Sequence, residues 1–294
     1  MRTALLGLLA ETPIHPGAGT DTGFVDLPVA RESATDYPVI VGSSFKGALR
    51  DRYQEFRSAA GEVGDENPES TLPPDEPEQE KARIFGRQEN AGGLLVSDAK
   101  LLLLPVRSLS SQYKWVTCGH LLERLGRDQI RAGLAESMTP VPTPSPKRYF
   151  GTGDTTLFLE ERQFEPHGPL PEGLLDQLRP LVRHTTTGDR LADQLVILND
   201  DDFAWFARFG LSVNARNQLN ESTKTSENLW YEETIPPDAL FFCLLGERSA
   251  GALSAIRSML DAYPYFQVGG NETVGQGWFA VTWHDVSKGR EVRT

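Results

Sequence analysis

The order of four short apolar segments constrains the fold of this chain more than any other feature. Residues 3–9, 93–106, 239–246 and 278–283 have the composition of buried strands. The second segment is long enough for two strands about a turn at 97–100, where polar residues interrupt it. None of the four approaches the roughly 18 consecutive apolar residues that a membrane helix needs. The sequence therefore predicts a buried sheet in a soluble protein.

Two helices are expected between these strands. Apolar side chains recur at helical spacing from Phe45 to Phe56, and a second helix is expected over 250–260. The resulting order of strand, helix, strands, helix and strand is that of a ferredoxin-like (RRM-like) fold with insertions. Because a chain of 294 residues can form one large core, we predict a single α+β domain over 1–294.

Polar residues at the expected helix starts predict three N-caps. Ser43 or Ser44 would cap the first helix, Thr117 a short leucine-rich helix, and Asp200 an aromatic helix over 203–209. Each would accept a hydrogen bond from a backbone N–H group of the first turn.

The two cysteines lie far apart and form no Cys-x-x-Cys motif. Cys118 and Cys243 are therefore expected to be buried reduced thiols of a cytoplasmic protein. The only stretch with a charged start and an apolar run, Met1–Ala10, fits a buried first strand better than a signal peptide.

The net charge of −12 at first argues against a nucleic-acid partner. However, residues 61–80 hold eight acidic residues and no Lys or Arg, so this segment carries two thirds of the net charge. Its acidic, proline-rich composition is typical of a disordered insertion. The rest of the chain can still carry a local basic groove.

Two further segments are expected to lie on the surface. Residues 12–38 form a long loop with Gly17, Gly19 and Gly23, whose permissive backbone would let a phosphate chain approach closely. Alternating apolar and polar residues within about 205–234 surround a polar tip at 220–228, which predicts a long hairpin.

Several motifs, taken in order, resemble the RAMP superfamily of CRISPR proteins, and in particular its type III-B backbone subunit. The turn Gly-Ser-Ser-Phe-Lys-Gly at 42–47 carries the superfamily resemblance, and position 36 is Asp where the family often has Gly. The matching segments are His15-Pro-Gly-Ala-Gly19, Val25-Asp-Leu-Pro28, Arg31-Glu32, residues 98–106, Trp230-Tyr-Glu-Glu-Thr-Ile-Pro236 and residues 268–277. The resemblance implies a RAMP core with an inserted thumb hairpin.

The resemblance also implies a site for cutting RNA. Asp26 matches the family's catalytic aspartate, which is required for cleavage with a divalent cation such as Mg²⁺ or Mn²⁺. A carboxylate can hold such a cation against the scissile phosphate. His15, Tyr231, Glu232 and Glu233 match positions near the same site, and which of the two glutamates corresponds stays open.

By the same resemblance the chain would bind a CRISPR guide RNA and the single-stranded target RNA paired with it. It would form a helical filament with copies of itself, capped by other subunits of the complex and accompanied by the small subunit. Lys46 and Arg50 add positive charge to a helix start that suits phosphate binding. The expected RNA-binding residues are Gly17, Gly19, Arg31, Ser43, Ser44, Lys46, Arg50, Gly269, Gly270, Gly275 and Gly277.

Three other functions are compatible with the same residues. The chain could be a guide-RNA scaffold in which Asp26 is only structural. It could be the type III-A counterpart, although the Val-Asp-Leu-Pro and Trp-Tyr-Glu-Glu segments favour type III-B. It could also be a standalone processing endonuclease that uses His15 as a general base.

Overall fold

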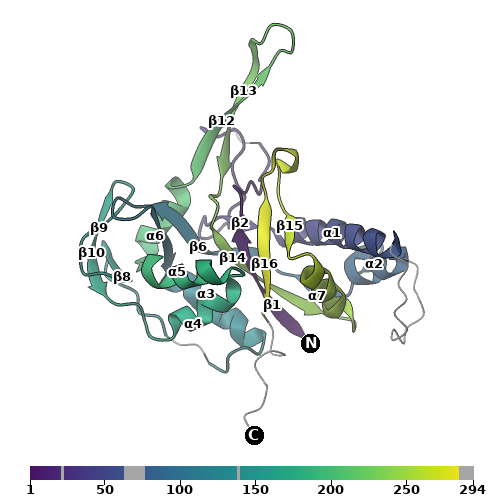
Figure 1. Ribbon diagram of the computed structural model, residues 1–294, viewed down its shortest axis with the longest axis horizontal. Helices are drawn as coiled ribbons and strands as arrows, with labels where there is room; N and C mark the ends of the chain where they lie inside the picture. The colour runs from purple at the N-terminus through teal and green to yellow at the C-terminus, as the bar shows by residue number, and fades with distance from the viewer. Residues whose placement is uncertain (21–22, 63–76, 138–139, 285–294) are drawn as a thin grey trace.

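The structure is a computed structural model that describes residues 1–20, 23–62, 77–137 and 140–284 (Figure 1). In this part of the chain, no helix is both long and apolar enough to span a bilayer.

Four antiparallel strands form the centre of a large mixed sheet, in the order β16-β1-β14-β6. In chain order, α1 lies between β1 and β6, and α7 lies between β14 and β16. Strand order 4-1-3-2 with this connectivity is the ferredoxin-like arrangement. The α+β ferredoxin-like prediction is therefore confirmed. The core elements are β1 (Thr3–Ala10), α1 (Gly42–Glu62), β6 (Ala99–Arg107), β14 (Leu240–Glu247), α7 (Ala252–Ala262) and β16 (Trp278–His284).

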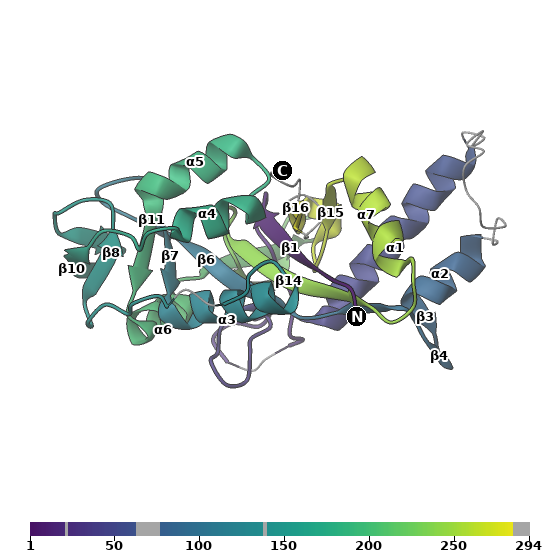
Figure 2. The same cartoon turned by 90° about the horizontal axis from the view of Figure 1, so that it is seen from below.

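The long insertion between β6 and β14 extends the same sheet. Its strands continue in the order β7-β11-β8-β10-β9, and Figure 2 shows α4 and α5 on one face of this part and α3 and α6 on the other. The elements are β7 (Tyr113–Cys118), α3 (Gly119–Arg131), β8 (Arg148–Gly151), β9 (Leu157–Leu159), β10 (Arg162–Gly168), α4 (Leu174–Leu178), η1 (Arg179–Leu181), α5 (Thr185–Gln194), β11 (Leu195–Leu198) and α6 (Asp200–Phe209).

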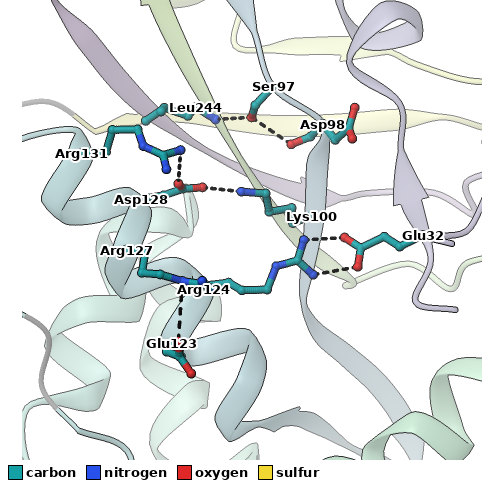
Figure 3. A network of polar contacts seen from close by, with 10 residues as sticks. All are labelled: Glu32, Ser97, Asp98, Lys100, Glu123, Arg124, Arg127, Asp128, Arg131 and Leu244. Atoms are coloured by element: carbon teal, nitrogen blue, oxygen red, sulfur yellow. Dashed lines mark hydrogen bonds and ion pairs between the residues drawn. The ribbon is translucent and has the colours of Figure 1, made fainter. Parts of the chain in front are cut away.

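The prediction of a turn at 97–100 is wrong. Strands β5 (Leu94–Val96) and β6 both pair antiparallel with β14, so the chain continues in one direction through Ser97 and Asp98. The Ser97 hydroxyl accepts a hydrogen bond from the backbone N–H of Leu244 at 2.9 Å (Figure 3). These polar residues therefore interrupt a strand without reversing it.

The three expected caps are also not those of the structure. The Asp98 carboxylate, from the break between β5 and β6, accepts from the Gly42 N–H at 2.7 Å at the start of α1. At α3, the N-cap position is Cys118 instead of the expected Thr117. The Asp200 carboxylate accepts a hydrogen bond from the backbone N–H of His120 in the first turn of α3. Asn199 caps α6, one residue before the expected Asp200. The helix starts were near the expected places, but the capping partners were different.

A buried ion pair ties α3 to the sheet. Lys100 of β6 lies 2.6 Å from the carboxylate of Asp128, which is 2% exposed and also pairs with Arg131 (Figure 3). The Lys100 ammonium also lies over the ring of Phe242. Because each charge has a partner, burial of this pair leaves no isolated ion in the core.

Two hairpins project from the body. The long one, β12 (Ser212–Leu219) with β13 (Ser226–Thr234), extends away from the sheet (Figure 1), and residues 205–209 of the expected thumb segment belong to α6. The short one, β3 (Gly86–Arg87) with β4 (Asn90–Ala91), follows helix α2 (Pro77–Phe85). Of the acidic segment 61–80, the ends are helical, and residues 63–76 lie outside the described residues.

The last elements connect these parts. Strand β2 (Val39–Ile40) pairs with β6 just before α1 begins. Strand β15 (Tyr265–Gln267) pairs with β16, and a glycine loop with the short helix η2 (Glu272–Val274) joins the two.

Candidate functional site

Three segments that are distant in the sequence meet at the root of the β12–β13 hairpin. They are the loop 11–38, the root of β13, and the glycine loop 268–277 (Figure 1). Single β-bridges join Ile14 to Ile235 and Leu27 to Glu232. The N–H of Gly270 donates to the carbonyl of His15 at 2.9 Å. The fold therefore brings the expected catalytic loop and the expected glycine loop together.

Asp26 is exposed at this junction and is held through one carboxylate oxygen. Its Oδ2 accepts from the backbone N–H of Tyr231 at 2.7 Å. Next to it, the N–H of Leu27 donates to the Tyr231 carbonyl at 3.1 Å, and the Glu233 N–H donates to the Leu27 carbonyl at 3.0 Å. The residues around Asp26 thus pair with β13 like a short third strand. Within the described residues, the other oxygen, Oδ1, has no hydrogen-bond partner.

His15 is almost buried, at 8% exposure, behind the same loop. Its Nδ1 lies 2.8 Å from the carbonyl oxygen of Glu233. Since a carbonyl can only accept, Nδ1 carries the proton, and Nε2 is left with a lone pair in the neutral ring. Nε2 faces Gly17, where a methyl group would lie 3.1 Å from it.

The two glutamates of the Trp-Tyr-Glu-Glu motif have different surroundings because neighbouring strand residues point to opposite faces. Glu233 pairs with Arg31 at 2.7 Å and accepts from the Val29 N–H, so it fixes the loop. Glu232 is 2% exposed, accepts from the side-chain amide of Asn271, and lies 3.6 Å from Arg216. Glu232 therefore faces the glycine loop, whereas Glu233 holds the loop that carries Asp26.

Arg31, an expected RNA-binding residue, is occupied by contacts inside the protein. Besides Glu233, its guanidinium donates to the carbonyls of Ala207 and Asp36 at 2.7 and 2.8 Å. Asp36 itself has a φ of 61°, in the left-handed region that favours glycine. The geometry gives Arg31 a structural role in shaping the loop.

Glu32 anchors the same loop to helix α3. Both of its carboxylate oxygens accept from Arg124 of α3, at 2.6 and 2.8 Å (Figure 3). Burial alone would raise the pKa of Glu32, but the hydrogen bonds from Arg124 and Thr35 lower it overall. This paired geometry is the strong form of the arginine–carboxylate contact. Arg31 and Glu32 thus hold one loop to two different parts of the fold.

The glycine loop packs closely against the His15 segment. Gly269 has a φ of 101°, and a Cβ there would lie 2.7 Å from the His15 carbonyl oxygen. The N–H of Gly277 donates to the Pro13 carbonyl at 3.0 Å. Gly275 also has a positive φ, of 80°, and has open space around it. Two of these glycines therefore serve close backbone packing, while Gly275 lies open to a ligand.

The remaining expected RNA-binding residues lie in two places. Gly17 and Gly19 are exposed in the loop, and Ser43, Ser44 and Arg50 are exposed on the first turns of α1. The Nζ of Lys46 donates to the Leu94 carbonyl at 3.0 Å, and burial lowers its pKa. The ring of Phe45 packs on that of Phe266, with centroids 5.5 Å apart, just before the glycine loop. The start of α1 is thus a neighbour of the site.

Asn271 and Arg216 complete the site, and neither was among the residues expected from the sequence motifs. Asn271 adopts a left-handed conformation, with φ 65°, and its side chain joins Glu232 to Gln276. Arg216 lies opposite Trp230 in the hairpin register. The Gly-Gly-Asn triplet was a signal for Asn271, because Asn tolerates positive φ. The position of Arg216 near Glu232 follows only from the register in which β12 pairs with β13.

The long hairpin is amphipathic. Cross-strand partners share a face, so Ala215 lies with Tyr231 and Asn217 with Leu229. The exposed apolar side chains of this face are Val213, Leu219, Leu229 and Tyr231. The opposite face is polar and carries Asn214, Arg216, Gln218, Asn228 and Glu232 beside the half-buried Trp230.

The donor set at Asp26 fits a metal that the protein holds only in part. Among the described residues, no group of three His, Cys, Asp or Glu side chains could hold a metal ion. Mg²⁺, however, is commonly bound by one or two carboxylates together with substrate phosphate and water. The exposed Oδ1 of Asp26 is compatible with that kind of binding.

Comparison with known proteins agrees with this architecture. The RAMP superfamily matches residues 8–280. The CRISPR system Cmr endoribonuclease Cmr4 of Pyrococcus furiosus is 33% identical over 300 residues, which cover 98% of this chain and 97% of that protein.

Two solved structures are similar over nearly the whole chain. The crystal structure of oligomeric Cmr4 from Pyrococcus furiosus has a TM-score of 0.72 and 29% identity, and the match covers 98% of this chain and 99% of that one. A cryo-EM structure of the type III-B Cmr-beta bound to cognate target RNA has a TM-score of 0.73. At 20% identity, with coverage of 96% and 97%, the latter shows a shared fold.

Proposed function

This chain belongs to the RAMP superfamily and to the family of Cmr4 subunits, and from this we propose that it is the RNA-binding backbone subunit of a type III-B CRISPR effector complex. In this proposal it binds a guide RNA and cuts the target RNA paired with it at regular intervals. The name of the Pyrococcus furiosus relative, an endoribonuclease, supports the reaction class.

The observation that carries the proposal is the geometry of Asp26. Its carboxylate is exposed, and one oxygen is fixed by the Tyr231 N–H, so the other can face a substrate. A carboxylate fixed in this way can orient a 2′-hydroxyl for in-line attack on the adjacent phosphate. The 2′ oxygen then bonds to phosphorus as its proton passes to water, and the bond to the 5′ oxygen of the next nucleotide breaks. That oxygen takes a proton from water, so the products are a 2′,3′-cyclic phosphate and a 5′-hydroxyl.

A divalent cation such as Mg²⁺ or Mn²⁺ would be held by Asp26 together with RNA phosphate, and it would stabilise negative charge on the leaving oxygen. The chain's own residues set the geometry. Arg31 with Glu233 and Glu32 with Arg124 fix the loop at two neighbouring positions that follow Asp26 in the chain. Together they hold the Asp26 carboxylate at the hairpin root.

His15 supports the site from behind. Because its Nδ1–H is bound to the Glu233 carbonyl, the ring is oriented with Nε2 toward the loop backbone at Gly17. This burial favours a positioning role over that of a freely accessible base. It therefore does not favour the standalone processing endonuclease.

The long hairpin would act as the thumb that separates stacked bases of the guide–target duplex. Its exposed apolar face offers Leu229 and Tyr231 for contact with bases, and it joins the loop of Asp26 directly. Deletion of the tip, residues 221–227, is expected to impair target cleavage while the monomer stays folded. Normal periodic cleavage by the folded deletion variant would contradict this role.

The expected partners follow from the same proposal. They are the guide RNA, the target RNA, copies of this chain and other subunits of the complex, including the small subunit, in the cytoplasm. The oligomeric crystal form of the relative supports assembly with copies of itself. Unequal faces on each subunit would produce an open filament.

A scaffold without catalysis is the second candidate, and one observation favours it. The hydrogen bond from the Tyr231 N–H to Asp26 is also what a purely structural aspartate would make. The nuclease and the scaffold therefore differ in whether RNA cleavage needs the other carboxylate oxygen of Asp26, Oδ1.

The test is cleavage of an end-labelled complementary RNA by the reconstituted complex with Mg²⁺ or Mn²⁺. Asp26→Asn keeps one acceptor oxygen for the Tyr231 N–H but removes the charge. We expect regularly spaced products from the wild type and none from Asp26→Asn, with RNA binding retained. Asp154→Asn, an exposed acid in another part of the fold, is the control. Unchanged products from Asp26→Asn would favour the scaffold.

A further inference from the structure

A second hollow lies away from Asp26, where α2, the β3–β4 hairpin and the turn after β14 meet. It has a volume of about 800 Å³ and is lined by Arg83, Arg87 and Arg248 together with Asn90, Gly93 and Ser249. All three arginines are exposed to solvent. We call this feature the arginine hollow.

The arginine hollow differs from the rest of the surface in how its arginines are paired. Across residues 1–20, 23–62, 77–137 and 140–284 there are 20 arginines, and 14 of them lie within 4.0 Å of a carboxylate. Of the six that do not, three line this one hollow. In a chain with a net charge of −12, the described residues therefore gather three arginines without a carboxylate inside 4.0 Å at one hollow, where Glu78, whose pKa is lowered by Lys81 and also by Arg87, is the acidic lining residue.

The contacts that these arginines do make leave most of their donors available. Arg83 donates to the carbonyl of Ala250 at 3.1 Å, and Arg87 to that of Glu78 at 3.5 Å. The carboxylate of Glu78, the acidic residue that lines the hollow, lies 2.8 Å from Lys81. Each guanidinium carries five N–H donors in a planar fork that matches a phosphate group. The hollow is thus suited to a polyanion with phosphate geometry.

The arginine hollow lies on the same side of the molecule as the proposed RNA site. Figure 2 shows the β3–β4 hairpin and the loop between β1 and β2 projecting from one side of the sheet, with the start of α1 between them. Lys46 of α1 donates to the carbonyl of Leu94, the residue after Gly93 of the hollow. Positive groups therefore continue from the start of α1 toward the hollow.

We propose that the arginine hollow binds the phosphodiester backbone of RNA, as a contact separate from the site around Asp26. This inference rests on the proposed RNA-binding function and extends it to residues that neither the sequence motifs nor the catalytic loop include. The contact would be to phosphates and so independent of base sequence.

The test uses the full chain and fluorescein-labelled single-stranded poly(U), with affinity measured by anisotropy over a range of salt concentrations. The triple variant R83Q/R87Q/R248Q is compared with R107Q/R127Q/R179Q, which removes the same charge from exposed arginines that have carboxylate partners. We expect the first variant to bind several-fold more weakly at low salt. Its plot of log affinity against log salt should be shallower by about 2, because each phosphate contact contributes about 0.7.

A single variant, R248Q, guards against loss of folding, since no described residue accepts a hydrogen bond from the Arg248 side chain. It should reduce the salt slope by about 0.7. Equal affinity and slope in the two triple variants, with the wild type binding poly(U), would overturn this inference alone. The inference would also be overturned if R83Q/R87Q/R248Q bound poly(U) normally but no longer assembled with copies of itself, because the hollow would then bind an acidic protein segment. A wild type that binds no RNA would overturn the proposed function as well.

Discussion

The central sheet and the loop that carries Asp26 are held in place by different kinds of contact. The sheet is held by apolar burial, and most residues of β1 and β14 are hardly exposed at all. Among the described residues, the loop 11–38 is held by hydrogen bonds, by the ion pairs of Arg31, Glu32 and Asp36, and by the packing of His15 against glycines. The difference predicts that core changes lower global stability, whereas loop changes alter the geometry of Asp26 first.

The largest effect is expected in the core. Phe241 of β14 is fully buried and meets the ring of Phe279 edge to face, with centroids 6.1 Å apart. Phe241→Ala should lower the free energy of unfolding by about 3–5 kcal/mol, because it leaves a cavity that the sheet cannot close. Urea denaturation followed by fluorescence measures this. Phe209→Ala, at a ring that is 68% exposed, is the control and should stay within about 0.5 kcal/mol.

A smaller, local effect is expected at Arg31. Arg31→Gln should lower the free energy of opening of the loop by about 1–3 kcal/mol, because Glu233 loses its charged partner and two carbonyls lose a donor. Amide hydrogen exchange at Leu27, Val29 and Glu233 reports that opening. Exchange that accelerates equally in β1 and β14 would contradict this prediction, since the loop and the sheet would then open together.

The pairing of Glu32 with Arg124 predicts a dependence on pH. Because the pKa of Glu32 is lowered below its ordinary value of 4.5, its contribution to stability is present above that pH and is lost as the pH falls through the folded-state pKa. Wild type should therefore lose stability faster than Glu32→Gln below about pH 4.5. Melting temperatures from pH 6 to about pH 3 measure this, and parallel curves for the two proteins would contradict it.

The smallest effect is expected at Gly17. Gly17→Ala places a methyl group 3.1 Å from Nε2 of His15, so the ring must shift by a few tenths of an ångström. Cleavage should fall a few-fold with little change in stability, and the ¹⁵N chemical shift of Nε2 should move. Gly19→Ala serves as a control for adding a methyl group to this loop, although its φ of 98° adds backbone strain there. An unchanged Nε2 shift in Gly17→Ala would show that the ring does not depend on this contact.

The core was predictable because its pattern is local. Strand and helix periodicity identified β1, β14, β16, α1 and α7, and their order identified the ferredoxin-like arrangement. The cap of α6 was missed by one residue, whereas the partners at the starts of α1 and α3 were not predictable, because Asp98 and Asp200 lie far from these helices in the chain. The sequence shows that a helix needs a cap but not which distant carboxylate supplies it.

The site divides in the same way. Motifs selected His15, Asp26 and the residues at 231–233, and the structure brings them together at the hairpin root. The contacts of Arg31 depend on folding, which turns an exposed-looking cation into an internal partner of Glu233. Arg216 approaches Glu232 only through the strand register.

The short third strand at Leu27 has a mechanical consequence. Asp26 is joined to β13 by three hydrogen bonds in its immediate neighbourhood, one of them to its own carboxylate. The root of the hairpin and the Asp26 carboxylate are therefore directly connected. A force on the tip that tilts the hairpin at its root would also move Asp26. The position of the hairpin tip and the orientation of the carboxylate would then change together.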